Sequence, residues 1–347
     1  MVPPASAGPF ATRITELFGT RLPIVAAGLQ WISDASYVSA AVRAGVMGFI
    51  TARSFATPER VREEIRRCRD LTGSDRFGVN LSMLPVPQPH ERIEELVEVI
   101  ADEKVPFVET AGRNPQLHLP ILRSAGVKLM HKVPTLRHAL TAQRLDVDAV
   151  CLVGAEAGGH PAADLVGTLV QATLLARSVR IPTVIGGGIG TGEQIVAALA
   201  LGVDGVAMGT RFLVAAEAWA HDDYKQRLVA ADETATALVM QSLNNTCRAL
   251  ANETTRTVAQ MERDGAGLAE LMPHITGQLG RAAYASGDAR IGLISLGQAV
   301  AFADRVEPFA AITARLEAEI AAALAQLDAR RRDPVPAAAG ATTGAAA

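Results

Sequence analysis

Eight short apolar runs alternate with amphipathic segments between residues 23 and 212, and this alternation constrains the fold of the 347-residue chain more than any other feature. Most runs are continuously apolar, as expected of strands with helices on one face and a core on the other. The expected strands are Pro23–Gly28, Val46–Thr51, Phe77–Leu81, Phe107–Gly112, Val127–Val133, Ala149–Gly154, Pro182–Gly188 and Gly205–Phe212. Strand followed by helix, repeated in this way, predicts a closed α/β (β/α)8 TIM barrel.

The segments between the runs begin with residues that favour helix starts. Thr57 precedes Pro58, which places a capping hydroxyl before a proline at the first helical position. Thr135 follows a proline as an expected N-cap, and Thr191 and Gln194 have the spacing of a capping box. These signals support the predicted alternation of strands and helices.

The pattern changes after Phe212, and this change suggests how the chain is divided. Residues 213–291 show helical runs and polar turns without a further expected strand, so we expect a helical insertion or lid after strand eight. An amphipathic helix over 309–327 then closes the barrel, which comprises residues 12–212 and 292–332. Residues 1–11 and 333–347 offer little to bury and are expected to be disordered.

Charge and cysteine content exclude several classes of protein. A formal net charge of −3 and a pI near 6.2 give no basic surface for nucleic acid or an acidic membrane. Three scattered cysteines provide neither zinc-ligand spacing nor a disulfide framework. We expect a cytoplasmic protein that acts on small molecules without a bound metal, as a monomer or a homodimer.

Two glycine clusters indicate a phosphate site. Gly186–Gly188 follows the seventh expected strand, and Gly209 with Thr210 follows the eighth. Backbone N–H groups at such places can point at an anion, and many barrels hold phosphate there. A GxGxxG motif is absent after the first strand, which argues against an open dinucleotide-binding sheet.

Polar residues at the strand ends are the candidates for chemistry. His160 follows two glycines and can exchange protons near neutral pH, although a plain loop histidine fits equally well. Lys132 ends an apolar strand and should face a polar ligand or a carboxylate. Trp31 either stacks on a ring or packs under the insertion, and Ser295 either reaches the mouth or bonds to backbone.

Several motifs together resemble the nitronate monooxygenase superfamily of FMN-dependent barrels over about residues 12–327. They are GLQWIS at 28–33, NLSMLP at 80–85, ETAGRNP at 109–115, HKVPTLRHAL at 131–140 and the segment 186–212. Within the superfamily these motifs look closest to NAD(P)H:quinone reductases. EAGGH at 156–160 instead resembles true nitronate monooxygenases and flavin-dependent enoyl-ACP reductases.

The resemblance implies FMN as cofactor, NADH or NADPH as co-substrate, and a set of site residues. It assigns the FMN phosphate to Gly186, Gly187, Gly188, Gly209 and Thr210, and the rest of the flavin to Gly28, Leu29, Asn80, Lys132 and Gly159. It makes His160 catalytic, aligns Ser295 with a pocket residue and places Pro85 in a loop that lines the entrance. Trp31, by its position after the first strand, is the third candidate for contact with the substrate. Ala26 and Leu29 depart from the family's usual glutamine and methionine, so backbone groups are expected to meet the flavin there.

By this resemblance the chain oxidises NAD(P)H through FMN and reduces a quinone-like or other small organic acceptor. The alternative is oxidation of alkyl nitronates with O2, in which His160 is the base that converts a neutral nitroalkane into a nitronate. In a reductase the same histidine donates a proton or orients substrate. An enoyl-thioester reductase and a non-catalytic FMN-binding protein are the remaining hypotheses.

Overall fold

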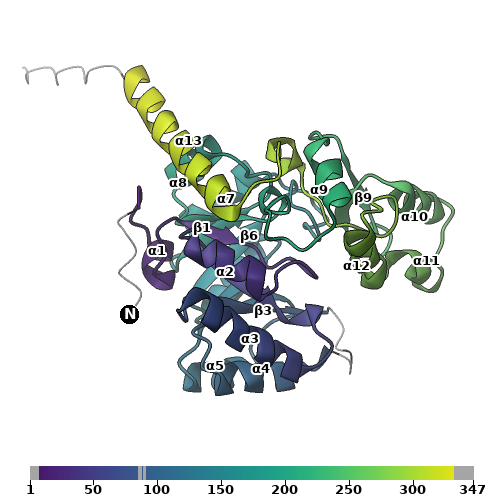
Figure 1. Ribbon diagram of the computed structural model, residues 1–347, viewed down its shortest axis with the longest axis horizontal. Coiled ribbons are helices and arrows are strands. Elements are labelled where there is room, and N and C mark those ends of the chain that lie inside the picture. The colour runs from purple at the N-terminus through teal and green to yellow at the C-terminus, as the bar shows by residue number, and fades with distance from the viewer. Residues whose placement is uncertain (1–7, 85–87, 89–90, 332–347) are drawn as a thin grey trace, which may run out of the picture.

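Eight parallel strands close into a barrel in the computed structural model, which describes residues 8–84, 88 and 91–331 (Figure 1). Each strand pairs with the next along the chain, and β1 pairs with β8. The strands are β1 (Ile24–Ala26), β2 (Met47–Thr51), β3 (Gly78–Met83), β4 (Phe107–Gly112), β5 (Lys128–Val133), β6 (Ala149–Val153), β7 (Thr183–Gly186) and β8 (Gly205–Met208). The predicted TIM barrel is confirmed, and the last run continues beyond its strand as the 3₁₀ turn η3 (Thr210–Phe212).

Helices connect successive strands on the outside of the barrel. They are α2 (Ala35–Arg43), α3 (Pro58–Thr72), α4 (Ile93–Asp102), α5 (Leu119–Ser124), α6 (Leu136–Arg144), α7 (Thr168–Ser178) and α8 (Gly192–Ala200), with the short η1 (Ala52–Ser54) after β2. The Thr57 hydroxyl caps α3 with Pro58 in its first turn, and Thr191 and Gln194 form the expected capping box. These local signals therefore predicted the helix starts correctly.

A short helix that the sequence did not reveal, α1 (Arg13–Phe18), closes one end of the barrel. The ring of Phe18 packs edge-on against Phe49 and Phe107, with centroid distances of 6.0 and 5.1 Å. Ile14 lies in the same buried cluster. Since α1 covers this end, the opening lies at the other end, where the strands have their C-terminal residues (Figure 1).

The segment after β8 forms a lobe beyond the open end of the barrel (Figure 1). Its elements are α9 (Asp222–Val229), β9 (Thr236–Val239), β10 (Cys247–Leu250), α10 (Glu253–Arg263), α11 (Leu268–Ile275) and α12 (Gly277–Ser286). The expectation that this segment lacks strands is wrong, because β9 and β10 pair antiparallel. Each has only four residues and no clear polar alternation, so its sequence carries little strand signal.

The chain returns through η4 (Gln298–Phe302) to the long helix α13 (Phe309–Arg330), which was expected over 309–327. Helix α13 packs against α8 and α2 and takes the place of a helix after β8. The approach to α8 is close, because a Cβ added at Gly192 would lie 2.4 Å from the Ile320 nitrogen. The terminal segments expected to be disordered, 1–11 and 333–347, fall almost wholly outside the described residues.

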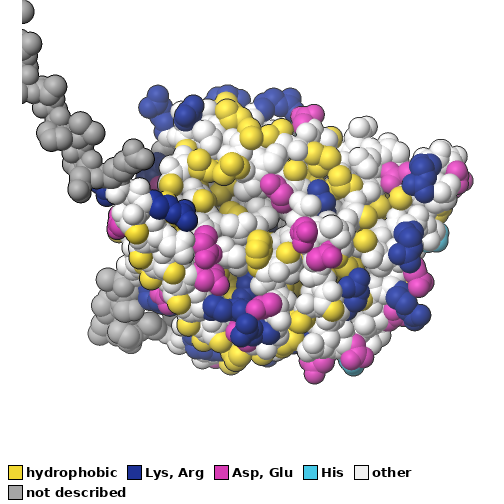
Figure 2. All heavy atoms as spheres, turned by 90° about the horizontal axis from the view of Figure 1, so that it is seen from above, with side chains coloured by type: hydrophobic (Ala, Val, Ile, Leu, Met, Phe, Trp, Pro, Cys, Tyr) yellow, Lys and Arg dark blue, Asp and Glu magenta, His cyan; other side chains and the backbone are white. Residues whose placement is uncertain are grey.

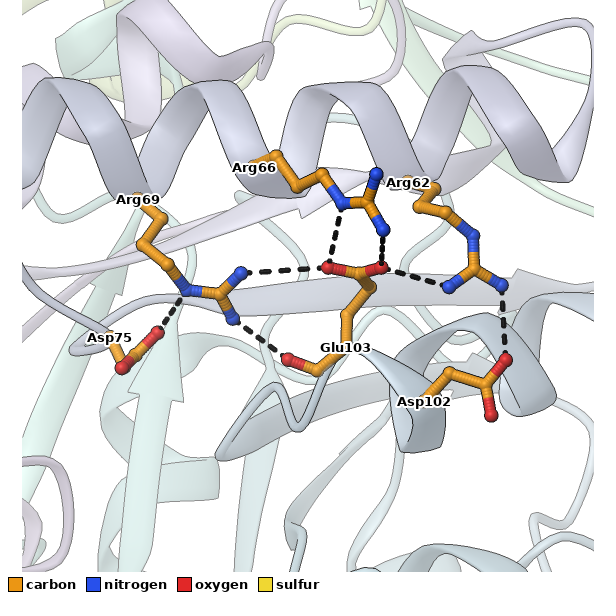
Figure 3. Close-up of polar contacts among 6 residues, drawn as sticks. All are labelled: Arg62, Arg66, Arg69, Asp75, Asp102 and Glu103. Atoms are coloured by element: carbon orange, nitrogen blue, oxygen red, sulfur yellow. Dashed lines mark hydrogen bonds and ion pairs between the residues drawn. The ribbon is translucent and has the colours of Figure 1, made fainter.

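An ion-pair network joins α3 to the residues that follow α4 (Figure 3). Arg62, Arg66 and Arg69 on α3 all contact Glu103, whose side chain is 8% exposed. Arg66 binds it with two hydrogen bonds of 2.8 and 3.2 Å, and Arg69 also donates to the Glu103 carbonyl at 2.7 Å. The network fixes the outer layer on the side of the barrel that carries β3 and β4.

The outer surface mixes charges of both signs with apolar side chains on the face drawn in Figure 2. Within the described part of the chain, no helix has the length and apolar character needed to cross a membrane.

Candidate active site

Three side chains from neighbouring strands meet inside the open end of the barrel. The Glu109 carboxylate of β4 is fully buried and accepts hydrogen bonds from Lys132 Nζ at 3.0 Å and from Asn80 Nδ2 at 2.5 Å. Burial alone would lower the pKa of Lys132, but the charge of Glu109 outweighs it, and the pKa is raised. Lys132 is therefore a cation with a carboxylate partner, and its side chain remains 20% exposed toward the mouth.

The floor beside this cluster is made by Gly28 and Thr51. A Cβ at Gly28 would lie 2.9 Å from Asn80 Cβ and 3.1 Å from Thr51 Oγ1. Thr51 Oγ1 is buried and has no hydrogen-bond partner among the described residues. Glycine thus leaves space at the end of β1, and an unpaired hydroxyl lies next to it.

Leu29 follows this floor, and its backbone is already engaged. Its N–H donates to Ser33 Oγ at 2.8 Å, and its carbonyl accepts from Ile32 and Ser33. Its Cδ2 lies 3.2 Å from the position of a Cβ at Gly209. A contact from Leu29 to a bound group would therefore come from its side chain, whereas the sequence suggested its backbone.

The two glycine loops present bare N–H groups. Gly187 and Gly188 have φ angles of 107° and 70°, a region that glycine favours. The N–H groups of these two residues, and of Gly209 and Thr210, make no hydrogen bond to described residues. Gly186 differs, because it is the last residue of β7 and is paired with β6 and β8.

The neighbouring N–H groups at the start of α8 are satisfied by side chains. Gln194 Oε1 accepts from Gly190 at 2.8 Å and from Thr191 at 3.2 Å. Glu319 of α13 accepts from the Gly192 N–H at 2.7 Å. An anion at this edge would therefore meet the N–H groups of the two glycine loops and not the helix terminus itself.

These features fit FMN. The bare N–H groups after β7 and β8 suit its phosphate. The glycine floor, the unpaired Thr51 hydroxyl and the exposed end of Lys132 suit a planar polar ring across the mouth. Among the described residues, no group of three His, Cys, Asp or Glu side chains is placed to hold a metal ion.

His160 lies in the loop after β6, and the insertion fixes that loop. Gly159 and Arg248 of β10 exchange two backbone hydrogen bonds of 2.7 and 3.0 Å. His160 is an exposed residue in this loop, next to the contact with β10. Desolvation lowers the pKa of His160, and the positive charge of Arg53 lowers it further. The neutral form of the imidazole is therefore favoured at pH 7.

The same loop receives two more contacts. Arg248 Nε donates to the Ala155 carbonyl at 2.9 Å, and Ser295 forms a bridge with Ala249 on the edge of β10 that Gly159 also contacts. Ser295 Oγ lies 3.8 Å from the position of a Cβ at Gly159. The structure thus brings the predicted residues Gly159, His160 and Ser295 together.

Glu156 connects the His160 loop to the phosphate side. Its carboxylate accepts from the Thr168 N–H at 2.9 Å and from the Thr168 hydroxyl at 2.6 Å, at the start of α7. Its carbonyl accepts from Gln298 at 3.0 Å, and its Cβ would lie 3.1 Å from a Cβ at Gly188. A displacement of the His160 loop would therefore also displace the Gly187–Gly188 loop, and the reverse.

Trp31 packs under the insertion, one of its two expected placements. Its Nε1 donates to the Gly277 carbonyl at 3.0 Å, Arg281 lies 5.3 Å from its ring centroid, and Trp219 donates to its carbonyl. Its φ of 72° is uncommon for a bulky residue. Pro85, the remaining predicted substrate residue, lies outside the described residues.

A cavity of about 360 Å³ extends between α7 and α8, where Leu169 and Ala197 line it. Its lining also includes Gly187, Gly188 and Glu156 of the candidate site. It does not include His160 or Lys132, so its size says nothing about the chemistry at the mouth.

Sequence reasoning missed Glu109, Thr51 and Arg248 as site residues. Glu109 has a recognisable signal, because it is a carboxylate inside a predicted strand next to the strand of Lys132. Thr51 ends an expected strand and could have been placed on the rim. No sequence pattern identified Arg248 as a site residue, because the strand that carries it, β10, was not expected.

Comparison with known proteins agrees with this geometry. The sequence model of the protein family described as "Nitronate monooxygenase" matches residues 11–319 of the chain. A Rhodococcus jostii protein named (3aS,4S,5R,7aS)-5-hydroxy-7a-methyl-1-oxo-octahydro-1H-indene-4-carboxyl-CoA dehydrogenase is 32% identical over 63% of the chain, a match that spans 60% of that relative's own length. None of the relatives named in this subsection is a quinone reductase.

Two solved structures are similar over nearly the whole chain. FabK from Thermotoga maritima has a TM-score of 0.84 and 30% identity, and covers 92% of this chain and 99% of its own. Nitroalkane oxidase from Streptomyces ansochromogenes has a TM-score of 0.77 and 27% identity, and covers 91% of this chain and 100% of its own. With the match to residues 11–319, these findings show that the chain belongs to the nitronate monooxygenase family.

Proposed function

We propose that the chain is an FMN-dependent oxidoreductase that oxidises small nitro compounds, with His160 as the general base. The main support for this proposal is the position of His160, an exposed histidine after β6 at the mouth of the barrel, whose pKa is lowered. A neutral imidazole has an unprotonated ring nitrogen that can accept a proton, whereas a general acid would start as the imidazolium, so the lowered pKa suits the base role better than the acid role of a reductase. The similarity to a nitroalkane oxidase supports the same substrate class.

The residues of the chain have distinct tasks in this proposal. The N–H groups of Gly187, Gly188, Gly209 and Thr210 would hold the FMN phosphate, and Lys132 would contact the flavin. His160 removes the proton from the carbon next to the nitro group, and the electron pair of that C–H bond moves into the nitro group to give a nitronate. When bound, FMN would supply the redox chemistry that oxidises the nitronate, with O2 as the final electron acceptor.

A second candidate is the NAD(P)H-dependent reduction of a quinone-like acceptor or an acyl thioester. The similarity to a CoA-linked dehydrogenase favours it, because that relative acts on a thioester by its name. Here NADH or NADPH would donate a hydride, and His160 would orient the acceptor. Quinone reduction remains a prediction from the sequence motifs.

Anaerobic mixing separates the two candidates. The purified protein should show the visible spectrum of FMN, and propyl-2-nitronate should bleach it faster than NADH or NADPH does. Bleaching by a nicotinamide with no response to nitronate would support the reductase instead. A protein that binds no FMN would contradict both.

A His160→Asn variant tests the role of the base. Because a preformed nitronate needs no proton removal, the variant should lose about 100-fold or more of its kcat/KM with neutral nitroethane and much less with ethyl nitronate. Equal losses with both substrates would contradict the general-base role, as would unchanged rates.

A further inference from the structure

Arg53 lies on the rim of the mouth, directly after β2. Its strand pairs with β3, so that Thr51 lies opposite Asn80 of the Glu109 cluster. The next residue, Ser54, accepts the Trp31 N–H at 2.7 Å. Arg53 therefore lies between the loop after β1 and the cluster at the ends of β3 to β5.

The Arg53 guanidinium has no ion pair or hydrogen bond within the described part of the chain, although it is half-buried. Burial lowers the pKa of Arg53, and the charge of Glu91 offsets this only in part. A half-buried cation without a bound anion is costly, and guanidinium groups in such places usually have a carboxylate partner.

The carboxylate that lines the same small gap as Arg53 is already engaged. Glu91 pairs with Arg113 at 3.2 Å and accepts from the N–H groups of Leu84 at 2.6 Å and Gln88 at 2.9 Å. Its two oxygens thus have three donors, and its side chain is only 3% exposed. Glu91 is thus occupied by Leu84, Gln88 and Arg113, and among these described contacts it leaves the charge of Arg53 largely uncompensated.

Arg53 also acts on His160 through space. Its charge is the second cause of the lowered pKa of His160, after desolvation. Arg53 follows β2 and His160 follows β6, so both residues lie beyond the carboxyl ends of barrel strands, the edge that forms the mouth. Lys132, a second cation at this edge, is neutralised by Glu109.

We propose that Arg53 binds the planar two-oxygen anionic group of the substrate, a nitronate or a carboxylate, at the mouth that also holds His160. The guanidinium fork matches two coplanar oxygens, and an anion would complete the charge balance that the described protein groups leave open. The inference rests on the proposed function in placing the substrate at this mouth. It narrows the substrate class to small organic anions, or to neutral nitro compounds that become anions when His160 takes a proton.

Binding without turnover tests the proposal. The ligand is propanoate, which has the two-oxygen group but no reactive C–H bond for this chemistry, titrated calorimetrically into the FMN-loaded protein. Arg53→Gln should raise its Kd by about 10- to 100-fold, the range for losing a charge-assisted hydrogen-bonded pair. Arg53→Lys should recover part of the affinity. Arg60→Gln, which removes an exposed arginine from α3, is the matched control and should change the Kd by less than about 2-fold.

Steady-state kinetics with a charged and a neutral substrate provide a second test of the Arg53 proposal. Arg53→Gln should raise the KM for propyl-2-nitronate by about 10-fold or more and change the KM for a neutral quinone by less than about 3-fold. A carboxylate response without a nitronate response assigns Arg53 to carboxylates, and both responses assign it to the shared anionic group.

The two proposals fail in different ways. If nitronates are not oxidised but propanoate binding depends on Arg53, the anion site stands and the proposed function falls. If nitronates are oxidised and Arg53→Gln leaves both the propanoate Kd and the nitronate KM within about 2-fold of the parent, the anion site is overturned. Equal loss of affinity for neutral and anionic ligands would also overturn it, since that pattern indicates a general disturbance of the mouth.

Discussion

Arg248 and Gly159 exchange two backbone hydrogen bonds, so the insertion is joined by a strand-like bridge to the residue before His160. The Arg248 side chain adds a third contact, to the Ala155 carbonyl at 2.9 Å. The segment that lies over the barrel thus also determines where the imidazole is held. A loop with two glycines and a positive φ of 85° at Gly159 would otherwise have considerable freedom.

Arg248→Met should therefore lower activity without lowering FMN affinity. The variant keeps the backbone bridge and loses the charged hydrogen bond to Ala155, so we expect kcat to fall by about 10-fold. The Kd of FMN, measured by flavin fluorescence, should stay within about 2-fold, and the pH profile of kcat should change because His160 is held less firmly. Arg256→Met, an exposed change on α10, is the control. A loss of thermal stability with an unchanged pH profile would assign Arg248 a purely structural role.

Glu109→Gln should destabilise the protein and raise the midpoint potential of bound FMN. The change leaves Lys132 partly buried without its counter-charge, which typically costs about 3–5 kcal/mol of unfolding free energy. The folded pKa of Lys132 is raised, so the stabilisation by the pair is complete below the unfolded pKa of about 10.4 and is lost only as pH rises through the folded pKa. The defect should hence be full at pH 7.

Denaturation and potentiometry check this prediction, and a double variant keeps it testable if the single one does not fold. Glu109→Gln with Lys132→Met removes both charges and should recover much of the lost stability. Near-equal stability of the single variant and the parent protein would mean that the buried pair contributes little.

The pH dependence of nitroalkane oxidation follows from the lowered pKa of His160. The imidazole must be unprotonated to act as a base, so kcat/KM for a neutral nitroalkane should fall as the solution is acidified through that pKa and level off above it. The inflection should lie below 6.5, the ordinary value for histidine. Arg53→Gln removes a nearby positive charge and should move the inflection to higher pH, while Arg60→Gln should not. An inflection above 6.5 in the parent enzyme would contradict the assignment.

The barrel could be predicted from the sequence because its signals are local. Each strand is a continuous apolar run, and helix starts such as Thr57 with Pro58 act within a single turn. The hairpin of β9 and β10 was missed because its strands are stabilised by partners far along the chain, including Gly159 and Ser295. A run of four residues with mixed polarity is too short to predict a strand from sequence alone.

The positions of the glycine loops and of His160 at the strand ends could be read from the sequence, and their roles stay predictions; the charge partners could not be read from it. Lys132 was expected to face a ligand or a carboxylate, and only the alignment of β4 with β5 identifies Glu109 as its partner. The missing counter-charge of Arg53 could not be read from sequence either, because it depends on how fully Glu91 is occupied by other donors. Charge balance in a barrel mouth is set by residues from separate strands.

Gly187→Ala should weaken FMN binding. A Cβ at this position would lie 2.8 Å from Thr168 Oγ1 and 3.1 Å from the Ala157 nitrogen, and φ is 107°. Both the strain and the crowding would displace the bare N–H groups, so the Kd of FMN should rise by about 10-fold or more. Gly73→Ala is the matched control, since Gly73 has a φ of 60° with no atom within 4 Å of its Cβ position and ends α3. An unchanged Kd in Gly187→Ala would mean that this loop does not hold the phosphate.

Glu103→Ala should destabilise the barrel wall more than an ordinary surface change. Three arginines of α3 would then face one another without their shared carboxylate, and the contacts in Figure 3 would be lost together. We expect about 1–3 kcal/mol from chemical denaturation, against less than about 0.5 kcal/mol for Glu95→Ala, which breaks the exposed pair with Arg92.

The pH dependence of this difference gives a sharper test of the network. Burial would raise the pKa of Glu103, but the hydrogen bonds from Arg66 and Arg62 outweigh it and lower the pKa. A carboxyl with a lowered folded pKa stabilises the protein above its unfolded value of about 4.3, and this contribution is lost as pH falls through the folded pKa. The stability gap between the parent and Glu103→Ala should therefore be constant from pH 6 to 8 and shrink below about pH 4. A gap that persists unchanged at pH 3 would show that packing, and not charge, accounts for the effect of Glu103.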